Sequence, residues 1–590
     1  MRREDASGVP LAFQAQIPKR GKIQYAREDQ TSTRWLNEWL DGCPPVPESE
    51  DSNTPASQRR AVRPTAGTRL PQFSATVKTW EYTISWRMVT NGGQDDGVIR
   101  PVIGARGLPY FPGSSMKGAF RHACPPELVL EFCGNEVIEN GQKTTKPGIL
   151  RFHGGYPTSM SWGDKPRLVD LVHQQQNRQI GWLDQETSAH VLISLYQPKF
   201  KFGISSSKIP PDDPRWEQIK QIWEKALSYG LGSRVSAGYG YFNGVASSDR
   251  AILSINLKGQ GLSSKLLNGQ SEFRPNMFKA TLRGHTLRIL AGLIDDATTV
   301  NQLCAQIWGD TKSYQENNPH PIVGLVGVRF SWKKDQIQED IFKYKVWSRK
   351  KNKYVTVEMP IYEIESSKLE VVRTGSREIS PELREFLRYI LRFSLLIGGI
   401  GKSCRRTDHR IFYPNYLDGN KPNIGCHWEL LESSNNLAVT VGSDDLANIR
   451  HFFRHLRTKA IAWIETQNII VNPDAYINQW REVWHPNKVQ VWGRIAKDRN
   501  DSKAVYWYHQ TNRLKNTSLG GEQVGNGVRK ISGSYHRMYP RIQKTTSGKF
   551  IRKQSEYIEI LTLFPDRSAG TQSFLNFIAQ QGGEGWIRLW

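Results

Sequence analysis

One type of segment occurs twice in the chain and constrains its fold more than any other feature. In both copies an amphipathic helix, expected over 214–229 and over 381–397, runs directly into a glycine-rich basic segment. These segments read GLGSRVSAGYGYF (230–242) and GGIGKSCRRTDHRIF (398–412). In each helix a proline suits the first turn and a glycine ends the last. The copies lie about 170 residues apart, a spacing that indicates a duplicated domain and not a solenoid repeat.

Each copy also has a similar entrance, in LPYFPGSSMKGAFRHA (108–123) and in FRPNMFKATLRGHTLRIL (273–290). In the first, PGSS (112–115) is expected to turn the chain and to begin a helix that Ser114 or Ser115 caps. The free N–H groups at the start of such a helix bind anions. The alternative is a solvated basic helix. Two basic residues four positions apart then lie on one helical face: Lys117 and Arg121.

The charge balance points to a polyanionic partner. The chain of 590 residues has 80 Lys and Arg against 56 Asp and Glu, a formal net charge of +24. Such an excess attracts nucleic acid through counterion release, and its even spread argues against an anionic membrane surface. No apolar run is long enough to span a bilayer. The six cysteines form no CxxC pair and no signal peptide is recognisable, so we expect a reduced, cytoplasmic protein.

The length predicts at least two domains. Residues 1–70 are rich in Arg, Pro, Ser and Thr and are interpreted as an N-terminal extension and flexible linker. The first domain is expected over 71–250, and a second domain with an elaborated C-terminal half over 251–590. Within that second half, strands are expected at 506–508 and at 557–564.

PYFPGSSMKGAFR followed by GLGSRVSAGYG resembles the signature pair of the RAMP superfamily (repeat-associated mysterious proteins), the subunits that coat CRISPR RNA in antiviral defence. The first unit is similar to the subunit that caps the backbone in Cmr-type complexes. The second is similar to another Cmr-type RAMP through SEFRPNMFKATLRGHTLR and GGIGKSCRRTDHR, although it lacks the PGSS turn. The chain therefore resembles a tandem fusion of two backbone subunits of a type III effector complex.

The resemblance implies an α+β protein with two tandem ferredoxin-like (RRM-like) βαββαβ domains with insertions. It implies a guide (CRISPR) RNA held by its phosphates, a complementary target RNA that pairs with the guide, and other Cas subunits as partners. From the residues themselves, Tyr239 is expected to stack on a splayed base. The residues implied to contact guide RNA are Ser114, Ser115, Lys117, Arg121, Gly232, Arg234, Ser236 and Tyr239 in the first domain, and Arg283, His285, Arg288, Lys402, Arg405 and Arg406 in the second.

Catalysis is left open. Backbone subunits of this family often cut target RNA with one Asp in the loop before the first helix, and that loop here (91–113) contains Asp95 and Asp96. Asp96 is the better placed, and a carboxylate there could position a divalent metal such as Mg²⁺ against a phosphodiester. The alternative is a solvated Asp-Gly turn. The corresponding loop of the second unit (259–275) has no Asp.

Two other functions stay possible: a stand-alone endoribonuclease that processes precursor CRISPR RNA, and a general single-strand RNA-binding protein. The first requires a His general base, but no His lies in a loop identifiable as that site. The basic stretch 529–553 is interpreted as a second RNA track, a subunit contact or a solvated surface. Four zinc-capable residues fit no standard spacing, so no metal ligands are predicted: Cys404, His409, Cys426 and His427.

Overall fold

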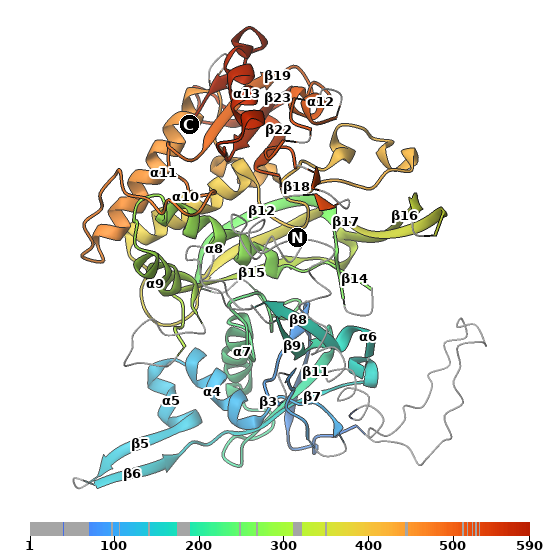
Figure 1. Cartoon of the computed structure of the whole chain (residues 1–590). Helices are drawn as coiled ribbons and strands as arrows, with labels where there is room; N and C mark the ends of the chain where they lie inside the picture. Colours follow the sequence, from blue (N-terminus) through green and yellow to red (C-terminus); the bar gives the residue numbers. More distant parts are fainter. Residues whose placement is uncertain are drawn as a thin grey trace.

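The protein is described from a computed structural model in which three sheets follow one another along the chain (Figure 1). Most of the predicted extension (1–70) lies outside the described part. The described residues are 39, 70–95, 98–104, 107–139, 142–163, 165–173, 189–246, 249–266, 270–310, 321–348, 351–442, 446–509, 513–515, 517–521, 523–524, 528–529 and 532–590.

The first sheet has the antiparallel order β1-β11-β7. Helices α4 and α7 pack against it, and the ring of Trp223 on α7 meets Phe202 on β11 with centroids 5.0 Å apart. No fourth strand is described beside β1; directly after β1, Ile84 forms an isolated antiparallel bridge with Phe242. The elements are β1 (Lys78–Thr83), α4 (Gly113–Ala123), β7 (Arg151–Pro157), β11 (Lys199–Ser205) and α7 (Arg215–Ser228).

The second sheet has the antiparallel order β15-β17-β12-β18, and β16 pairs with the distal part of β17 to form an arm. When β12, β15, β17 and β18 are numbered 1 to 4 along the chain, their order across the sheet is 2-3-1-4, with helices after the first and third strands. The elements are β12 (Ala251–Leu262), α8 (Asn276–Leu290), α9 (Ala297–Trp308), β15 (Val326–Trp332), β16 (Ile337–Ser348), β17 (Lys353–Arg373), α10 (Pro381–Ile397) and β18 (His427–Leu430).

The third sheet repeats this connectivity. Its order is β22-β23-β19-β24, again antiparallel and again 2-3-1-4, with α12 after the first strand and α13 after the third. Helix α11 packs on α10 and links the two sheets. The elements are α11 (Ala447–Glu465), β19 (Gln490–Ala496), α12 (Lys503–His509), β22 (Ser534–Lys544), β23 (Phe550–Leu563), α13 (Ala569–Ala579) and β24 (Ile587–Arg588).

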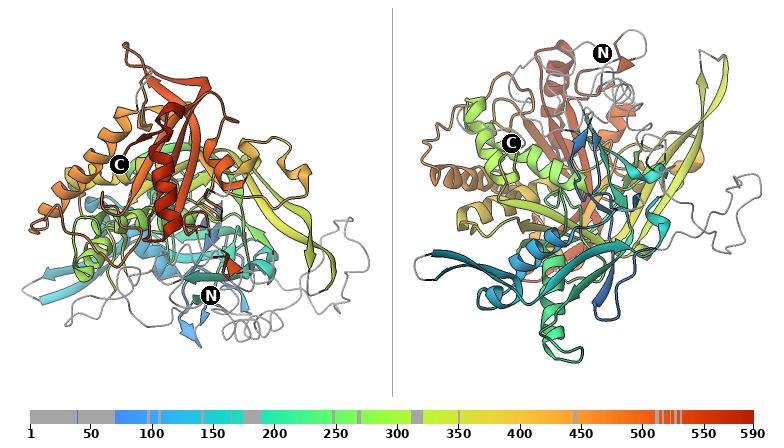
Figure 2. Two further views of the ribbon diagram at one scale, coloured as in Figure 1. Left: turned by 45° about the horizontal axis from the view of Figure 1, so that its top comes forward. Right: turned by 90° about the horizontal axis from the view of Figure 1, so that it is seen from below.

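A further four-stranded sheet, in the order β3-β4-β9-β8, and several smaller elements accompany these three sheets. Two hairpins, β5–β6 and the β16–β17 arm, project from the body on opposite sides (Figures 1 and 2). The remaining elements are β2 (Arg87–Met88), β3 (Gln94–Asp95), β4 (Val98–Ile99), α5 (Pro126–Cys133), β5 (Gly134–Glu139), β6 (Gln142–Pro147), α6 (Lys165–Leu168), β8 (Val169–His173), β9 (Ala189–Ile193), β10 (Leu195–Tyr196), β13 (Ser264–Lys265), β14 (Ser271–Glu272), β20 (Gln523–Val524) and β21 (Val528–Arg529), with short 3-10 turns between them.

The mixed helix and sheet content confirms the α+β class. Both predicted helices are present, as α7 and α10, and Ser380 caps α10 by accepting the Leu383 N–H. The strand predicted at 557–564 is the end of β23, but the strand predicted at 506–508 is wrong, because these residues lie within α12. None of the helices that the structure describes has the length and apolar character needed to cross a bilayer.

Two large hydrophobic cores and three smaller apolar clusters fill the described part of the chain. One core belongs to the first sheet and its helices, with Phe202 and Trp223 at its centre. A second, continuous core contains side chains of both later sheets, among them Leu257, Phe386 and Ile560. The second and third sheets therefore share one interior, and the first sheet meets them across a separate junction.

That junction is held by buried charges. Arg87 on β2 and Glu272 on β14 are 0% and 1% exposed, and an Arg87 Nη2 lies 2.5 Å from Glu272 Oε2. Trp86 donates its indole N–H to the same carboxylate. In a second pair the arginine comes from the second unit and the carboxylate from the first: Arg274 pairs with Asp170 on β8. Burial opposes ionisation of Asp170, but Arg274 and Arg87 outweigh it and lower the pKa of Asp170.

We expect Glu272→Gln to lower the free energy of unfolding by about 3–5 kcal/mol, because it removes the carboxylate that pairs directly with the buried Arg87 guanidinium. Urea denaturation of the full chain measures this. The matched control is Glu136→Gln, which breaks an exposed pair with Lys143 and should change stability by less than about 1 kcal/mol. Equal effects of the two substitutions would contradict the role assigned to the junction.

Candidate nucleic-acid interface

At the start of α4, Ser114 and Ser115 are exposed, whereas Gly113 packs closely on Phe152. The helix begins at Gly113, Pro112 precedes it, and no side chain caps it, so the prediction that Ser114 or Ser115 is the cap is wrong. Glycine is required at 113 because a Cβ there would lie 2.2 Å from the Phe152 carbonyl oxygen. Both serines are exposed. They stand at a helix N-terminus, where uncapped backbone N–H groups favour anions.

The two basic residues of α4 differ in their surroundings. Lys117 is exposed. Arg121 is half-buried and donates to the Gly134 carbonyl at 2.7 Å and to Asn135 Oδ1 at 2.8 Å. Arg121 therefore fixes the base of the β5–β6 hairpin, and Lys117 remains the charge that faces solvent.

The glycine-rich loop of the first unit folds back on β2 of the same unit. Gly232 and Gly240 have φ of +83° and +73°, and a Cβ on either would lie within 2.2 Å of a backbone oxygen. The Gly240 N–H donates to the Arg87 carbonyl at 2.7 Å. These glycines thus allow close backbone packing, and Gly232 is the exposed one of the two.

The prediction that Tyr239 stacks on a base is wrong for this structure, because the side chain is fully buried. Its hydroxyl donates to Asp170 Oδ2 at 2.6 Å, and its ring packs on Trp86 with centroids 4.6 Å apart. Burial, and then the Asp170 carboxylate, raise the pKa of Tyr239. The residue belongs to the junction between the units.

Two other residues of this loop, Arg234 and Ser236, meet Lys279 and Arg283 on α8 of the second unit. We call these four residues the junction cluster. Ala237 pairs with Val328 at the edge of β15, which brings the loop against α8. Lys279 Nζ donates to Ser236 Oγ at 2.7 Å. Two predicted residues from the first unit and one from the second are therefore brought together around a lysine that the sequence analysis missed.

Lys279 has an unusually low pKa. Burial lowers the pKa of Lys279 to about 7, and the neighbouring Arg283 and Arg234 guanidinium groups add to the effect. Asp310 is the carboxylate beside Arg283, with Nη2 and Oδ2 3.7 Å apart. A signal for Lys279 existed in the sequence, since it lies one helical turn before Arg283 on the same face of α8.

The other predicted residues of α8 lie in the interior. His285 and Arg288 are 0% exposed. Nε2 of His285 lies 2.8 Å from the Gly398 carbonyl, and burial lowers the pKa of His285 to about 3. Arg288 pairs with Glu482 and donates to the Tyr535 hydroxyl at 2.9 Å. The predicted contact of His285 and Arg288 with guide RNA does not fit these positions, because His285 is buried against Gly398 and Phe393, and Arg288 against Glu482 and Tyr535.

The second glycine-rich loop (398–406) is covered in the same way. Arg405 pairs with Glu482 at 2.5 Å, and the Arg406 guanidinium stacks over the Tyr508 ring at 3.7 Å. Burial opposes the charge of Glu482, but Arg405 and Arg288 outweigh it and lower the pKa of Glu482. Lys402 is half-buried, and burial lowers its pKa. Arg405 and Arg406 thus bind the third sheet, which the sequence did not reveal.

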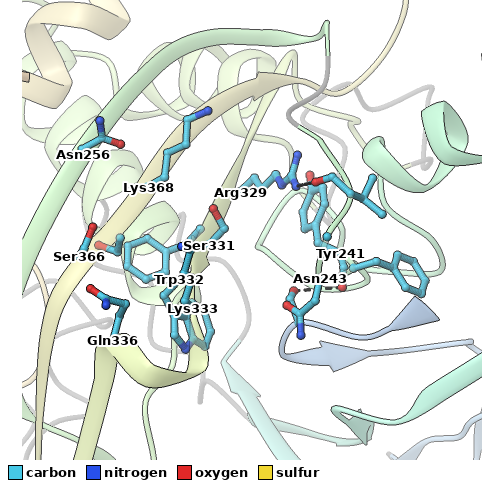
Figure 3. Close-up of a pocket in the computed structure, with 16 residues that line it drawn as sticks. Tyr241, Asn243, Asn256, Arg329, Ser331, Trp332, Lys333, Gln336, Ser366 and Lys368 are labelled. Atoms are coloured by element: carbon cyan, nitrogen blue, oxygen red, sulfur yellow. Dashed lines mark hydrogen bonds between the residues drawn. The ribbon is translucent and has the colours of Figure 1, made fainter. Parts of the chain in front are cut away.

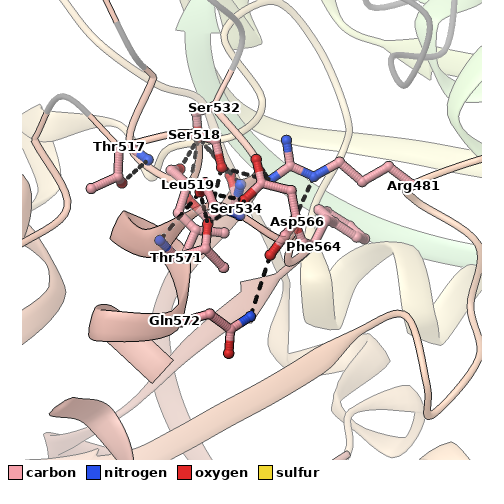
Figure 4. Close-up of polar contacts among 12 residues, drawn as sticks. Arg481, Thr517, Ser518, Leu519, Ser532, Ser534, Phe564, Asp566, Thr571 and Gln572 are labelled. Carbon is pink, nitrogen blue, oxygen red and sulfur yellow. Dashed lines mark hydrogen bonds and ion pairs between the residues drawn. The ribbon is translucent and has the colours of Figure 1, made fainter. Parts of the chain in front are cut away.

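A hydroxyl-rich network beside Glu482 completes this contact (Figure 4). Arg481 donates to the Phe564 carbonyl at 2.6 Å. Asp566 accepts from Ser568 and Thr571 at the start of α13, and Ser518 bonds Thr571 at 3.1 Å. Burial raises the pKa of Asp566, but hydrogen bonds from these hydroxyl groups and the charge of Arg481 outweigh burial. The pKa of Asp566 is therefore lowered. The network satisfies its own polar groups and anchors the third sheet.

Asp96 lies outside the described residues, and Asp95 is described only as the end of β3. Within the described part, no three His, Cys, Asp or Glu side chains gather as a metal site would require. Cys404 and Cys426 are buried as free thiols, and His427 bonds Glu429 at 2.6 Å.

No protein-family model and no curated protein matches the chain. Among solved structures it is similar to a chain of the type III-B Cmr-β complex bound to cognate target RNA, at 20% identity and a TM-score of 0.22, over 28% of this chain and 58% of that one. It is also similar to a chain of that complex bound to target RNA and AMPPnP in the presence of single-stranded DNA. There the identity is 10% and the TM-score 0.29, over 56% of this chain and 98% of that one. Similarities of this size assign neither fold nor function.

The lowered pKa of Lys279 predicts how stability depends on pH. Between about pH 7 and pH 10 the unfolded chain keeps the Lys279 proton and the folded protein releases it, so stability rises with pH by roughly 1.4 kcal/mol per unit. We expect Lys279→Met to be more stable than the wild type at pH 7, and this advantage to shrink by pH 9. Urea denaturation at both pH values measures it.

Lys225→Met is the control, because Lys225 is 46% exposed in an ion pair with Asp249. Its effect on stability should be small and nearly independent of pH over this range. An advantage of Lys279→Met that stays constant from pH 7 to pH 9 would show that Lys279 is not the titrating group.

Proposed function

We propose that the chain is a guide RNA-binding backbone subunit of a type III CRISPR effector complex, and that it recognises complementary target RNA beside other Cas subunits. The motif pair in 108–123 and 230–242 supports the family. The fold agrees with it: an antiparallel sheet with helices after its first and third strands and strand order 2-3-1-4 is the ferredoxin-like arrangement. The strand order of the second and third sheets supports this expectation, and the three strands of the first sheet are consistent with it.

The observation that carries the RNA-binding part of this proposal is the distal half of the β16–β17 arm. The segment 343–354 contains six Lys and Arg residues and no Asp or Glu. Trp347 and Tyr354 on its two strands are 52% and 66% exposed, and their rings meet edge to face with centroids 5.1 Å apart. Cations that hold phosphates beside exposed aromatic rings that stack on bases are typical of single-strand RNA binding.

The exposed tip of α4 and the junction cluster are two further groups of residues that could hold phosphates. Ser114, Ser115 and Lys117 offer an open helix N-terminus and one cation. Arg234 and Ser236 are half-buried at the junction. A phosphate that reached these groups would offset positive charge that the protein concentrates there. Such contacts would not depend on the guide sequence, because phosphates carry none.

Target cleavage by Asp96 is part of the same proposal. A loop carboxylate of this kind would hold a divalent metal such as Mg²⁺ beside the scissile phosphodiester, and the metal would stabilise the negative charge that develops there. Asp95, its neighbour in sequence, offers a matched comparison.

Removing arm charge should weaken RNA binding in a salt-dependent way. We expect Lys343→Ala/Lys345→Ala to lower the affinity of the full chain for a single-stranded oligoribonucleotide and to reduce the slope of log K against log salt by about 0.7 for each phosphate that the arm no longer binds. Fluorescence anisotropy at several salt concentrations measures this. Arg454→Ala/Lys459→Ala on α11 removes the same charge elsewhere and should leave the slope nearly unchanged.

Purification with the neighbouring proteins of its genome tests the assembly. A backbone subunit should co-purify with partner proteins and RNA of fixed length. A stand-alone processing nuclease should instead cut a labelled precursor hairpin alone. Recovery of the chain without RNA, combined with equal salt slopes for the arm and α11 variants, would refute the proposed function.

Asp96→Ala should abolish one specific product of target RNA cleavage by the assembled complex, with at least a roughly hundredfold loss of its rate, while target binding is unchanged. Denaturing gels of a matched target over time measure the products, and EDTA should remove the same product. Asp95→Ala is the control and should retain most of the activity. An unchanged product pattern in Asp96→Ala would assign this subunit a purely structural role in the complex.

A further inference from the structure

The two faces of the β16–β17 arm differ in chemistry. Successive side chains of a strand point to opposite faces, and residues directly paired across antiparallel strands share one face. The register of β16 on β17 therefore assigns each residue of the distal arm to a face. One face has the pairs Lys343–Glu358, Lys345–Thr356 and Trp347–Tyr354. The other, which we call the apolar face, has the pairs Phe342–Met359, Tyr344–Val357 and Val346–Val355.

The six residues of the apolar face are all aromatic or aliphatic. The rings of Phe342 and Tyr344 stack on each other with centroids 5.9 Å apart. Val346 is 37% exposed and the other five residues are half-buried. None of the six belongs to a hydrophobic core or cluster of the described part of the chain. Ile337, at the start of β16, does pack against the second core, so the apolar face begins where the interior of the body ends.

The arm is fixed at its base and projects at its tip (Figures 1 and 2). Lys333 and Gln336, in the turn that leads from β15 into β16, line a pocket of about 440 Å³ together with the segment 241–245 of the first unit (Figure 3). Strand β17 continues from the arm into the second sheet, where it pairs with β12 and β15. The 12 residues of β16 span about 40 Å. The distal arm can therefore reach a neighbouring molecule while its base stays in place.

A projecting hairpin does not require an apolar face. In the β5–β6 hairpin the cross-strand pairs are polar or mixed, as in Glu136–Thr145 and Ile138–Lys143. A two-stranded ribbon is marginally stable in water by itself and gains stability when another layer packs on its apolar side. The apolar face of the arm is thus typical of a protein contact.

Charge and size indicate what covers the apolar face. The segment 343–359 has six Lys and Arg residues and one carboxylate, Glu358, which pairs with Lys343 at 3.1 Å. A complementary protein surface has an apolar centre with acidic groups around it. Six residues are far fewer than the roughly 20–30 on each side of a stable interface. The apolar face is therefore too small to hold a second copy of the chain by itself, and it suits a partner that also contacts the body.

We propose that the apolar face of the arm docks on a neighbouring protein subunit whose apolar contact surface is surrounded by acidic groups. The opposite face, with Trp347 and Tyr354, stays open to RNA. This docking rests on the assembly part of the proposed function, because it names the surface that holds a partner subunit. It does not depend on RNA binding. One ribbon then separates a protein on one side from RNA on the other.

Tyr344→Thr/Val346→Thr tests the docking in the full chain, co-expressed with the neighbouring proteins of its genome. Threonine keeps the charge and suits a strand, but it removes most of the apolar contact. We expect the yield of assembled complex in size-exclusion chromatography to fall at least about tenfold. The matched control is Ile551→Thr, which removes a 47% exposed apolar side chain from β23 and should leave assembly unchanged. Thermal unfolding of the isolated variants should match that of the wild type, because the apolar face lies outside the cores.

The opposite face should give the opposite result. We expect Trp347→Ala/Tyr354→Ala to assemble as the wild type does and to weaken binding of an oligoribonucleotide by the isolated chain roughly fivefold to a hundredfold. Tyr344→Thr/Val346→Thr should change this RNA affinity less than about twofold. If the isolated wild type binds no RNA while assembly still depends on the apolar face, the RNA-binding part of the proposed function fails and the docking stands.

Photo-crosslinking keeps the test valid even if the threonine variant disturbs the arm. A benzoylphenylalanine introduced at position 344 should crosslink to another protein subunit in the purified complex. Crosslinks from position 344 to RNA or to a second copy of the chain would overturn the docking, and so would recovery of the chain without any partner protein. If the threonine variant assembles normally and position 344 crosslinks to no protein, the docking is overturned, whereas RNA binding by the isolated chain stands or fails independently.

Discussion

Buried arginine–carboxylate pairs hold this molecule together. At the first junction Arg87 meets Glu272 and Arg274 meets Asp170, and at the second Glu482 meets both Arg288 and Arg405. Each of these carboxylates would be costly to bury alone, and each guanidinium equally so. Every pair joins residues far apart in the sequence, so neither partner can be buried until two units have met. The relative placement of the three sheets thus depends on these charges as well as on apolar packing.

This explains why so many arginines of the glycine-rich motifs are internal. A guanidinium has five donors in a fixed plane and stays charged in a protein interior, which suits it to bridge a carboxylate and backbone carbonyls at once. Arg405 does this with Glu482 and the Ser532 carbonyl. The third sheet supplies such acceptors to the second glycine-rich loop. In the first glycine-rich loop, the half-buried Ser236 instead accepts a hydrogen bond from Lys279. One sequence motif therefore serves two physical purposes in the same chain.

The sequence predicted local structure better than it predicted exposure. The helices α7 and α10 follow from apolar spacing and from the proline and glycine at their ends, which are local properties. The alternating aromatic pattern at 506–508 predicts a strand, but three residues are too few to separate a strand from a short helix, and they lie in α12. Exposure of Arg288 or Tyr239 depends on which segment packs over it. That segment lies about 190 residues beyond Arg288, and Asp170 lies 69 residues before Tyr239.

The third sheet shows why the surface that remains for a ligand differs from the one that the motifs indicate. It has the same connectivity as the second, and it covers one glycine-rich loop with its own strands and loops. Two features with exposed charge lie outside it: the tip of α4 in the first unit and the basic aromatic arm on the second sheet. The second glycine-rich loop therefore serves as a joint between two sheets, although its sequence is like that of the first loop, which contacts no third sheet in the described part of the chain.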